Sequence, residues 1–486
     1  MGSGSDMVNF NILSPGVAPV LSPRLGKLAL AGRKSICTPH YLPLTTRGAV
    51  PHLSHDVIRD HTTVGSVYVG LEDSQRNFPL TQQRPPGLRS VIEKEKKHGG
   101  PPLYKTPAAP HESALRKFIS APEEFLLIMG ARRQPPVACP TPNSPTSISI
   151  LTSVGFRQLD AEEYIQATRT LRPDIIVGMA DLILGRQAGK KRCEKMVDRT
   201  HAHTRDATER LYGSSKVEER SKTAYFAPIL PLENTQQLLY LEELQDELRD
   251  FISGLALYES ASLSIIPEPL GTLPRLLFNE PATPHEVLKE IALGADLLTL
   301  PFLVKSSDAG MAFDFAFPPP SKSSEQTARP LALNLRSPTN ATDLSPLSEN
   351  CKCYACRNHH RAYLNHLLNA KEMLAWTLLQ IHNHHVLDNF FAGIRESIKN
   401  GTFEQHADSF HKVYAPAFPE QTGEGPRLRG YQLSPGGPNQ PPRHPKVFNR
   451  LDDAFDKYAE SKSSLGTPDA GSDELESRGF AEKKDH

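Results

Sequence analysis

The most informative stretch of the chain is CKCYACRNHHRAYLNHLLNAKEMLAWTLLQIHNHH, which spans residues 351–385. It holds three of the six cysteines of a 486-residue chain, Cys351, Cys353 and Cys356, in the spacing C-x-C-x2-C. Disulfides would need an even count and longer loops, whereas three closely spaced thiolates suit a single cation. Zinc prefers four tetrahedral nitrogen or sulfur ligands, so the pattern predicts a structural zinc site with a later histidine or cysteine as fourth ligand.

Helical periodicity narrows the choice of the fourth ligand. His359 and His360 follow the cysteines too closely to reach the same ion without strain. His382 shares a helical face with the apolar residues at 375, 378 and 379, whereas His384 and His385 point elsewhere. An unbroken helix from 356 to 382 would separate the ligands by about 39 Å. A zinc site therefore requires a chain reversal, which LNAKE (368–372) can provide; the alternative is a set of reduced core cysteines and a buried histidine.

Length and composition bound the remaining possibilities. A chain of this length allows about three domains, or one α/β barrel with insertions. The formal net charge is zero and the pI is about 7.3, so global charge does not indicate a nucleic-acid partner. No apolar run reaches the roughly 18 residues of a membrane span. Six scattered cysteines suit a reducing compartment.

The amino-terminal residues share one feature with targeting segments. No acidic residue occurs between Asp6 and Asp56, which is typical of transit peptides. Four prolines, at 15, 19, 23 and 39, would break an amphipathic helix there, and RLGKLALAG alternates like a strand. The first residues also lack the pattern of a signal peptide, so we expect a cytoplasmic protein.

Helices alternate with short apolar strands through the middle of the chain. DAEEYIQATRTLRPDIIVGMADLIL (160–184) and TPHEVLKEIALGADLLTLPF (283–302) both predict a helix followed by a strand, with Asp160 and Thr283 as N-caps. Residues 237–252 are predicted to be helical, and FISGLALYES (251–260) to contain a strand. This alternation indicates a parallel sheet, in either a doubly wound fold or a barrel. From about residue 415 the chain is rich in proline, glycine and charge, which predicts disorder apart from one short helix at 449–461.

The segment around the cysteines resembles the zinc-binding segment of the queuine tRNA-ribosyltransferase (tRNA-guanine transglycosylase) family. Members of that family carry C-x-C-x2-C and a histidine 25 residues beyond the third cysteine, in a His-Asn pair. The match falls on Cys351, Cys353, Cys356 and His382, followed by Asn383. Further matches in order are TTRGAVPHLSHD, LTSVGFRQLDAEEYIQATRTLRPDII and LPRLLFNEPATPHEVLKEIALGADLL, so the resemblance covers about residues 22–400.

The resemblance implies an irregular (β/α)8 TIM barrel with an inserted zinc-binding helical subdomain and one structural zinc ion per subunit. It also implies four parts: a flexible N-terminus at 1–21, a barrel body with N-terminal β elements at 22–333, the zinc subdomain with the last barrel helix at 334–414, and a mostly disordered tail at 415–486.

The sequence departs from the family at the positions that carry catalysis. Catalytic members use an aspartate nucleophile in a DCVLPTR-like run, and Thr299 stands at that position in GADLLTLPFLVK. Double displacement needs a carboxylate that attacks the ribose and leaves again, and a threonine hydroxyl is a poor substitute. An Asp-Ser-Gly-Gly-Phe motif is absent, and TSVGFRQ (152–158) is its nearest counterpart. Ser253-Gly254 stands for the Gly-Gly beside the base, and Asp181 falls near the base-recognition aspartate, with a structural role equally open.

Retention of the zinc segment without the catalytic residues looks like the accessory subunit of the eukaryotic enzyme. The resemblance then implies a non-catalytic partner of a catalytic subunit, acting on tRNA in queuosine modification, in the cytoplasm and peripherally at the mitochondrial outer membrane, with no integral membrane segment. The alternative is a diverged but active homodimeric transglycosylase. A generic zinc-dependent RNA-binding protein is a third interpretation.

Two surfaces follow as hypotheses. GRQAGKKRCEKMVDRTHAHTRDATER (185–210) is rich in lysine and arginine, including Lys190, Lys191 and Arg192, and is either a helix near tRNA phosphates or a solvated helix face, the simpler interpretation. Family members dimerise through the zinc subdomain, so helices within 361–400 are expected at the partner interface. Phe390, Phe391 and Ile394 are candidate anchors there, or core residues.

Overall fold

The computed structural model of the protein describes residues 8–14, 21–74, 102–109, 112–152, 155–185, 187–214, 216, 219–320, 328–420 and 425–426. The predicted helix at 449–461 and nearly all of the predicted tail at 415–486 lie outside these residues. No helix in the described part of the chain is long and apolar enough to cross a membrane.

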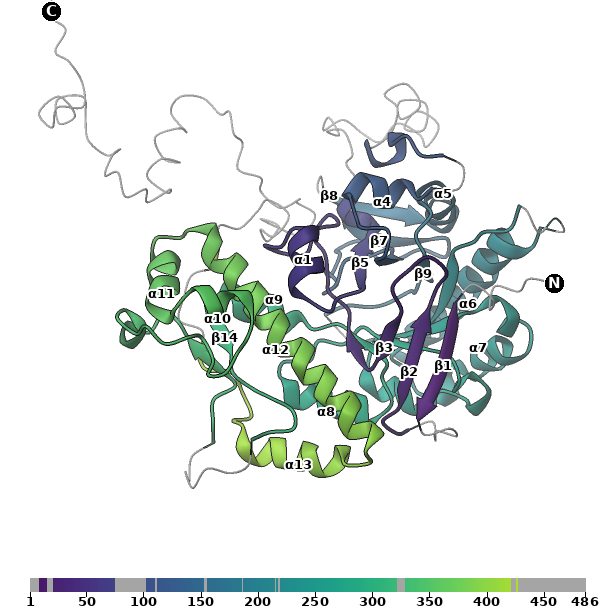
Figure 1. Cartoon of the computed structure of the whole chain (residues 1–486). Helices are drawn as coiled ribbons and strands as arrows, with labels where there is room; N and C mark the ends of the chain where they lie inside the picture. The colour runs from purple at the N-terminus through teal and green to yellow at the C-terminus, as the bar shows by residue number, and fades with distance from the viewer. Residues whose placement is uncertain are drawn as a thin grey trace, which may run out of the picture.

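The centre of the molecule is an eight-stranded parallel sheet (Figure 1). In spatial order its strands are β4 (His40–Tyr41), β13 (Leu297–Leu298), β12 (Arg275–Leu277), β11 (Gly254–Leu257), β10 (Ala224–Ile229), β9 (Ile175–Val177), β6 (Leu126–Gly130) and β5 (Ser66–Gly70). From β5 to β13, each strand of this sheet therefore neighbours the strand of the sheet that precedes it in the chain, and β4 pairs with β13. The two edges are joined by a parallel bridge between Leu44 and Tyr68, with hydrogen bonds on both sides of it, so the curled sheet meets itself.

Helices cover the outside of this sheet, because each is apolar on one face only. Those that follow the strands are α1 (His55–His61), α2 (Leu71–Ser74), η2 (Pro102–Lys105), α4 (Ala114–Ile119), α5 (Ala161–Leu171), α6 (Lys190–Tyr212), α7 (Asn234–Asp246), η4 (Arg249–Phe251), η5 (Ser260–Ile265), η6 (Glu268–Leu270), α8 (Pro284–Ala292) and α9 (Pro301–Asp308). The helix–strand pairs predicted from 160–184 and 283–302 are present, with Asp160 and Thr283 at the N-cap positions of α5 and α8. A hairpin of β7 (Ser147–Thr152) and β8 (Gly155–Asp160) lies beside the carboxyl end of the sheet, where Ile148 lines a small cavity with Tyr68.

Large apolar side chains fill the inside of the curled sheet. Ile128, Ile175 and Leu276 are fully buried there, and the ring of Phe226 lies where a Cβ on Gly254 would come within 2.5 Å of it. The interior is therefore a packed core rather than a channel.

A three-stranded antiparallel sheet covers the amino end of the parallel sheet. It consists of β1 (Asn9–Ser14), β2 (Leu25–Ala29) and β3 (Ile36–Thr38). Residues 9–14 were expected to belong to a flexible terminus; instead, alternating polar and apolar side chains let them pair with β2. Beneath this sheet the fully buried Arg24 donates from Nε to Asp296 Oδ1 at 3.0 Å, which ties the amino-terminal sheet to the loop before β13.

The carboxyl-terminal part builds a small helical subdomain beside the sheet. It contains β14 (Met311–Phe313), β15 (Ala332–Asn334), η7 (Pro338–Asn340), α10 (Tyr354–Asn358), α11 (Arg361–Asn369) and the start of α12 (Met373–Lys399). A separate apolar cluster around Leu364, Trp376 and Leu379 forms its core. Because β14 pairs with β15, the subdomain begins near residue 311, before the predicted boundary at 334.

The long helix α12 links the subdomain to the central sheet. Figure 1 shows it running from the group of α10 and α11 toward α8 and α13 (Phe403–Val413). Phe390, Phe391 and Ile394 are fully buried in the main core, where Phe390 packs edge-on against Phe315. The hypothesis that these residues anchor a partner is wrong, since their side chains are used inside this chain.

Substituting Gly130 with alanine tests the tightness of the interior. A Cβ at Gly130 would come 1.9 Å from Tyr68 Oη, and Tyr68 cannot yield because it is buried and its hydroxyl donates to the Arg132 carbonyl at 2.6 Å. We expect Gly130→Ala to lower the free energy of unfolding by about 1 to 3 kcal/mol in urea titrations. Gly65→Ala is the control, because its Cβ would first meet the flexible Lys34 side chain at 3.3 Å. Equal stability of the two variants would contradict the packed interior.

Candidate functional site

The three cysteines and His382 come together in the helical subdomain. The Sγ atoms of Cys351, Cys353 and Cys356 lie 3.7, 3.5 and 3.4 Å from His382 Nδ1. All four ligand atoms lie within 4.8 Å of one another. Ligands at ordinary zinc bond lengths in a tetrahedron are about 3.6 Å apart, so the four side chains fit one tetrahedral metal ion without room for a fifth ligand.

The local backbone structure fixes the positions of these ligand side chains. Cys353 is the N-cap of α10, and its Sγ accepts a hydrogen bond from the Cys356 backbone N–H at 3.3 Å. The chain reverses between α11 and α12, at residues 370–372, within the predicted turn. This reversal carries His382 back over the cysteines.

A second hydrogen bond fixes the imidazole of His382. Its Nε2 lies 2.9 Å from the Phe313 carbonyl oxygen, which can only accept, so Nε2 carries the proton. Nδ1 is then left with its lone pair directed at the three sulfur atoms. Such a backbone partner on the far nitrogen is typical of histidines that hold a metal.

Three sulfur groups so close together are unfavourable as free thiolates. Hydrogen bonds among them raise the pKa of Cys353 well above its usual range and lower that of Cys356 well below it. One thiolate thus forms at the expense of its neighbours unless a cation neutralises all three.

The other histidines of the opening stretch have structural roles. His360 caps α11 through a hydrogen bond from the Tyr363 N–H to its Nδ1 at 3.1 Å, and His359 stacks on Tyr363. His384 is fully buried on the opposite side of α12, where its Nδ1 lies 2.9 Å from the Tyr41 hydroxyl. Among the described residues, the only histidine whose ring nitrogen lies close to the three cysteine sulfur atoms is His382.

The carboxyl end of the parallel sheet, here called the mouth, is where parallel α/β barrels place their reactive groups. Thr299 lies there, directly after β13, and is 2% exposed. Its hydroxyl donates to the Asn279 carbonyl at 3.1 Å. A threonine held in this way has neither charge nor access to a substrate.

Aromatic side chains fill the mouth. The ring of Phe278 lies 5.1 Å from that of Tyr68 and 5.7 Å from that of Tyr258, between centroids. The cavity beside Tyr68 and Tyr258 measures about 20 Å³ among the described residues. One water molecule needs most of that volume, whereas small-molecule sites typically measure about 300 to 1,000 Å³. A purine base therefore has no place at the mouth in this conformation.

Asp181 lies just beyond β9 and is neutralised by the protein itself. Arg192 and Arg199 pair with its carboxylate at 2.6 and 3.1 Å, and Asn143 Nδ2 donates to it at 2.6 Å. Burial raises the pKa of Asp181, but the hydrogen bonds and positive charges of these donors lower it by a larger amount. The pKa of Asp181 is therefore below its usual value. The carboxylate is ionised and fully engaged, which supports the structural role rather than base recognition.

Ser253-Gly254, expected beside the base, lies elsewhere. Gly254 is the first residue of β11, at the amino end of the sheet, opposite Thr299. Of the run TSVGFRQ (152–158), Phe156, Arg157 and Gln158 belong to β8, and none of them lines the cavity at the mouth among the described residues. The structure thus brings the four predicted metal ligands together and does not gather the family's catalytic positions into one pocket.

The fold is a curled parallel α/β sheet with an added helical subdomain, and this subdomain carries a Cys3His cluster that could hold a metal ion. The family model described as queuine tRNA-ribosyltransferase matches residues 102–416. The chain belongs to this family. It is 33% identical over 402 residues to a protein of Schizosaccharomyces pombe named queuine tRNA-ribosyltransferase accessory subunit 2, covering 82% of this chain and 83% of that protein.

Proteins of the same name from animals are also similar. The one from Gallus gallus is 26% identical over 436 residues, with 79% of this chain and 93% of that protein covered. The one from Aedes aegypti is 24% identical over 423 residues, with 82% and 92% covered.

A buried acid beside the mouth gives a pH dependence that can be measured. Glu290 on α8 accepts a hydrogen bond from Asn279 Nδ2, and burial raises its pKa from 4.5 to about 7. Because the folded pKa is raised, Glu290 costs no stability below about pH 4.5, and the cost grows as pH rises toward 7. We expect Glu290→Gln to be more stable than the wild type at pH 8, by roughly 2 to 3 kcal/mol, and about equally stable at pH 4.5.

Urea titrations at several pH values measure this difference, and Glu280→Gln is the control because Glu280 is half exposed. A stability difference between wild type and Glu290→Gln that does not change with pH would show that folding does not raise the pKa of Glu290.

Proposed function

We propose that the chain is the non-catalytic accessory subunit of a heterodimeric queuine tRNA-ribosyltransferase, which exchanges guanine for queuine at the wobble position of tRNAs. The names of its relatives support this proposal, and so does its membership of the family. The observation that carries the non-catalytic part is the filled mouth, with Thr299 at the nucleophile position. We further propose that the curled sheet is the irregular (β/α)8 barrel of the family.

The chemistry of base exchange disfavours the alternative of an active homodimer. A nucleophile must attack the ribose carbon and leave again, which suits a carboxylate. The Thr299 hydroxyl is bonded to backbone, Asp181 is held by two arginines, and the mouth lacks the volume for a base. Restoring a carboxylate at position 299 would leave Asp181 paired with arginines and the mouth too small for a base.

Base-exchange assays test this proposal directly. The purified chain alone should give no measurable incorporation of labelled queuine into tRNA, and addition of the catalytic subunit should give full activity. Thr299→Asp should remain inactive alone, because aromatic rings still fill the mouth. Exchange by the isolated wild-type chain at the rate of the complex would establish the active homodimer instead.

We propose that the Cys3His cluster holds one structural zinc ion. Cys351, Cys353, Cys356 and His382 would be its ligands, since sulfur and imidazole donors at this spacing suit tetrahedral zinc. When bound, the ion neutralises the thiolates and cross-links the loop before α10 to α12. The Phe313 carbonyl keeps the imidazole in the correct tautomer.

Zinc analysis of cysteine variants checks this assignment. Cys353→Ala should lose its zinc and several kcal/mol of stability, because structural zinc sites in small peptides contribute about 10 to 16 kcal/mol. Cys37→Ala is the matched control, since Cys37 is exposed on β3 and far from the cluster in the chain. Stoichiometric zinc and unchanged stability in Cys353→Ala would refute the site.

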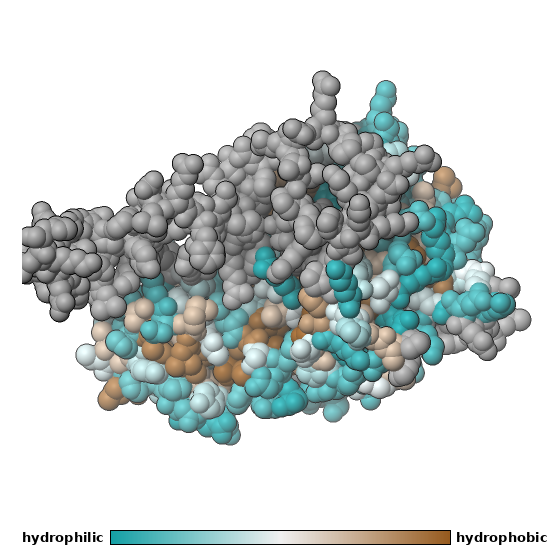
Figure 2. All heavy atoms as spheres, turned by 90° about the horizontal axis from the view of Figure 1, so that it is seen from above, coloured by the Kyte–Doolittle hydropathy of each residue, from teal (hydrophilic) through white to brown (hydrophobic). Residues whose placement is uncertain are grey.

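We propose that the catalytic subunit binds the outer face of the helical subdomain. Four of the nine large apolar side chains exposed in the described part of the chain belong to this subdomain, namely Leu344, Tyr354, Met373 and Leu374. Figure 2 shows exposed apolar side chains toward the side on which Figure 1 has α10 and α11. Such side chains can anchor an interface, and they replace the buried Phe390, Phe391 and Ile394 as candidates.

We propose a supporting tRNA contact on α6, limited to its free cations. Arg192 and Arg199 pair with Asp181, Arg210 pairs with Asp206, and Arg205 pairs with Glu243. Within the described residues, Lys190, Lys191 and Lys195 are exposed and have no acidic partner within 4.0 Å. The paired arginines favour the solvated-face interpretation for most of the helix and leave the three lysines for phosphate contacts.

The salt dependence of tRNA binding by the complex separates these interpretations. Neutralising Lys190, Lys191 and Lys195 with glutamine should weaken binding and flatten the slope of log K against log salt concentration by about 2 units, because each phosphate contact releases counterions. Lys399→Gln with Lys412→Gln is the control on other helices. An unchanged slope would show that the lysines only solvate α6.

We also propose the cytoplasm, and peripherally the mitochondrial outer membrane, as the location of the chain. The resemblance to the family is the support for this proposal.

A further inference from the structure

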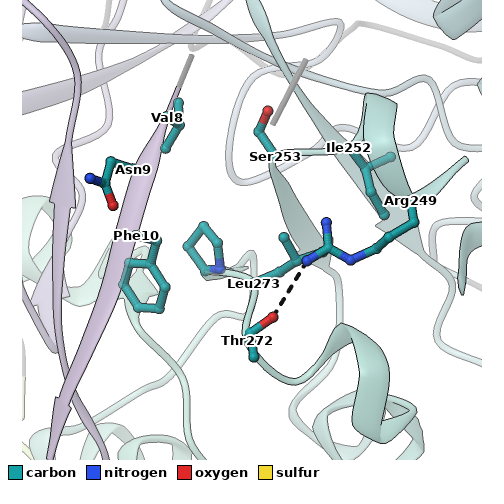
Figure 3. A pocket seen from close by; sticks show the side chains of 9 residues that line it. Val8, Asn9, Phe10, Arg249, Ile252, Ser253, Thr272 and Leu273 are labelled. Carbon is teal, nitrogen blue, oxygen red and sulfur yellow. Dashed lines mark hydrogen bonds between the residues drawn. The ribbon is translucent and has the colours of Figure 1, made fainter. Parts of the chain in front are cut away.

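A pocket of about 380 Å³ lies at the amino end of the parallel sheet, opposite the mouth (Figure 3). Strand β1 forms one wall with Phe10, and the loops before β11 and β12 form the other with Arg249, Ser253, Thr272 and Leu273. Its volume falls within the range of small-molecule sites, and it is much larger than the cavity at the mouth. The pocket takes no part in the chemistry of base exchange described above.

Buried contacts of Arg24 hold both walls in place. Its guanidinium donates to the carbonyl oxygens of Gly271 at 2.5 Å and Leu273 at 2.8 Å, on either side of Thr272. It also lies 5.5 Å from the centroid of the Phe10 ring. Gly26 allows that ring to pack closely, because a Cβ there would come 2.4 Å from it. The pocket is therefore formed before any ligand binds, which lowers the entropic cost of binding.

One cation faces the pocket without a carboxylate partner. Figure 3 shows Arg249 reaching along the wall toward Thr272, to which it donates a long hydrogen bond of 3.4 Å. No acidic oxygen of the described residues lies within 4.0 Å of its guanidinium. Of its acidic neighbours in the chain, Glu247 pairs with Arg205 at 3.7 Å, and Asp250 is exposed. Arg249 can thus offer a fork of N–H donors to an anion.

We propose that this pocket binds a small organic anion, with a phosphate or carboxylate group on Arg249 and a planar or apolar body between Phe10 and Leu273. The hydroxyl group of Thr272 adds a polar contact along one wall. A nucleoside monophosphate has the charge, the planar body and the size that this arrangement suits. A neutral nucleoside lacks the group for Arg249, and inorganic phosphate lacks the body for Phe10.

Calorimetric titration of the full-length chain tests the site with three probes: guanosine 5′-monophosphate, guanosine and inorganic phosphate. We expect saturable binding of the monophosphate to the wild type, at least tenfold weaker binding of each other probe, and at least tenfold weaker binding of the monophosphate to Arg249→Gln. Arg59→Gln is the control, because Arg59 is a half-exposed arginine of α1. Circular dichroism melting of the variants checks that they fold.

Each possible result of the titrations bears on a different part of the proposal. Absence of saturable monophosphate binding to the folded wild type would overturn the proposal, and so would equal binding by Arg249→Gln. Equal affinity for inorganic phosphate would overturn the contact with Phe10 and reduce the site to a simple anion site. None of these results depends on base exchange, so the proposed accessory function is unaffected by them.

Discussion

The hydrogen bond between His382 Nε2 and the Phe313 carbonyl is the contact on which the carboxyl-terminal half of the molecule depends. It sets the tautomer of the histidine and so turns Nδ1 toward the three sulfur atoms. The adjacent Asn383 binds the same strand, where its Oδ1 accepts from the Phe313 N–H at 2.8 Å and its Nδ2 donates to the Met311 carbonyl at 3.0 Å. The metal cluster and β14 are therefore positioned by two neighbouring side chains of α12.

The opposite face of α12 extends this coupling to the central sheet. The Tyr41 hydroxyl, at the end of β4, lies 2.9 Å from His384 Nδ1 and donates to Asp388 Oδ1 at 3.0 Å. Asp388 Oδ2 also accepts from the Thr63 N–H at 2.8 Å. These contacts fix the register of α12 against the sheet, because unpaired partners of these buried groups would each cost about 1 to 3 kcal/mol. The proposed metal ion would order the same helix from its opposite face.

Sequence reasoning predicted the features that depend on local spacing. The C-x-C-x2-C pattern and the helical face at 375, 378 and 379 indicated His382 as a ligand. The reversal near 370 was predicted because an unbroken helix from 356 to 382 would hold the ligands too far apart. Features that depend on distant contacts were not predictable in this way. The filling of the mouth by Phe278 with Tyr68 needs the folded sheet, because these residues are far apart in the chain. Asp181 and Arg192 are only 11 residues apart, but one follows β9 and the other lies on α6, so their pairing also depends on how these elements pack. The sequence allowed Phe391 to be either a core residue or an interface residue. The structure places it in the core, because its side chain is fully buried within this chain.

The central claim is that this chain keeps the family fold while its base site is filled. Calorimetric titration of queuine into the isolated chain, and into its complex with the catalytic subunit, tests this claim most directly. We expect no saturable binding to the isolated chain and one queuine per heterodimer, since Tyr68, Tyr258 and Phe278 occupy the mouth. Binding of one queuine to each isolated chain, or of two to each heterodimer, would contradict it.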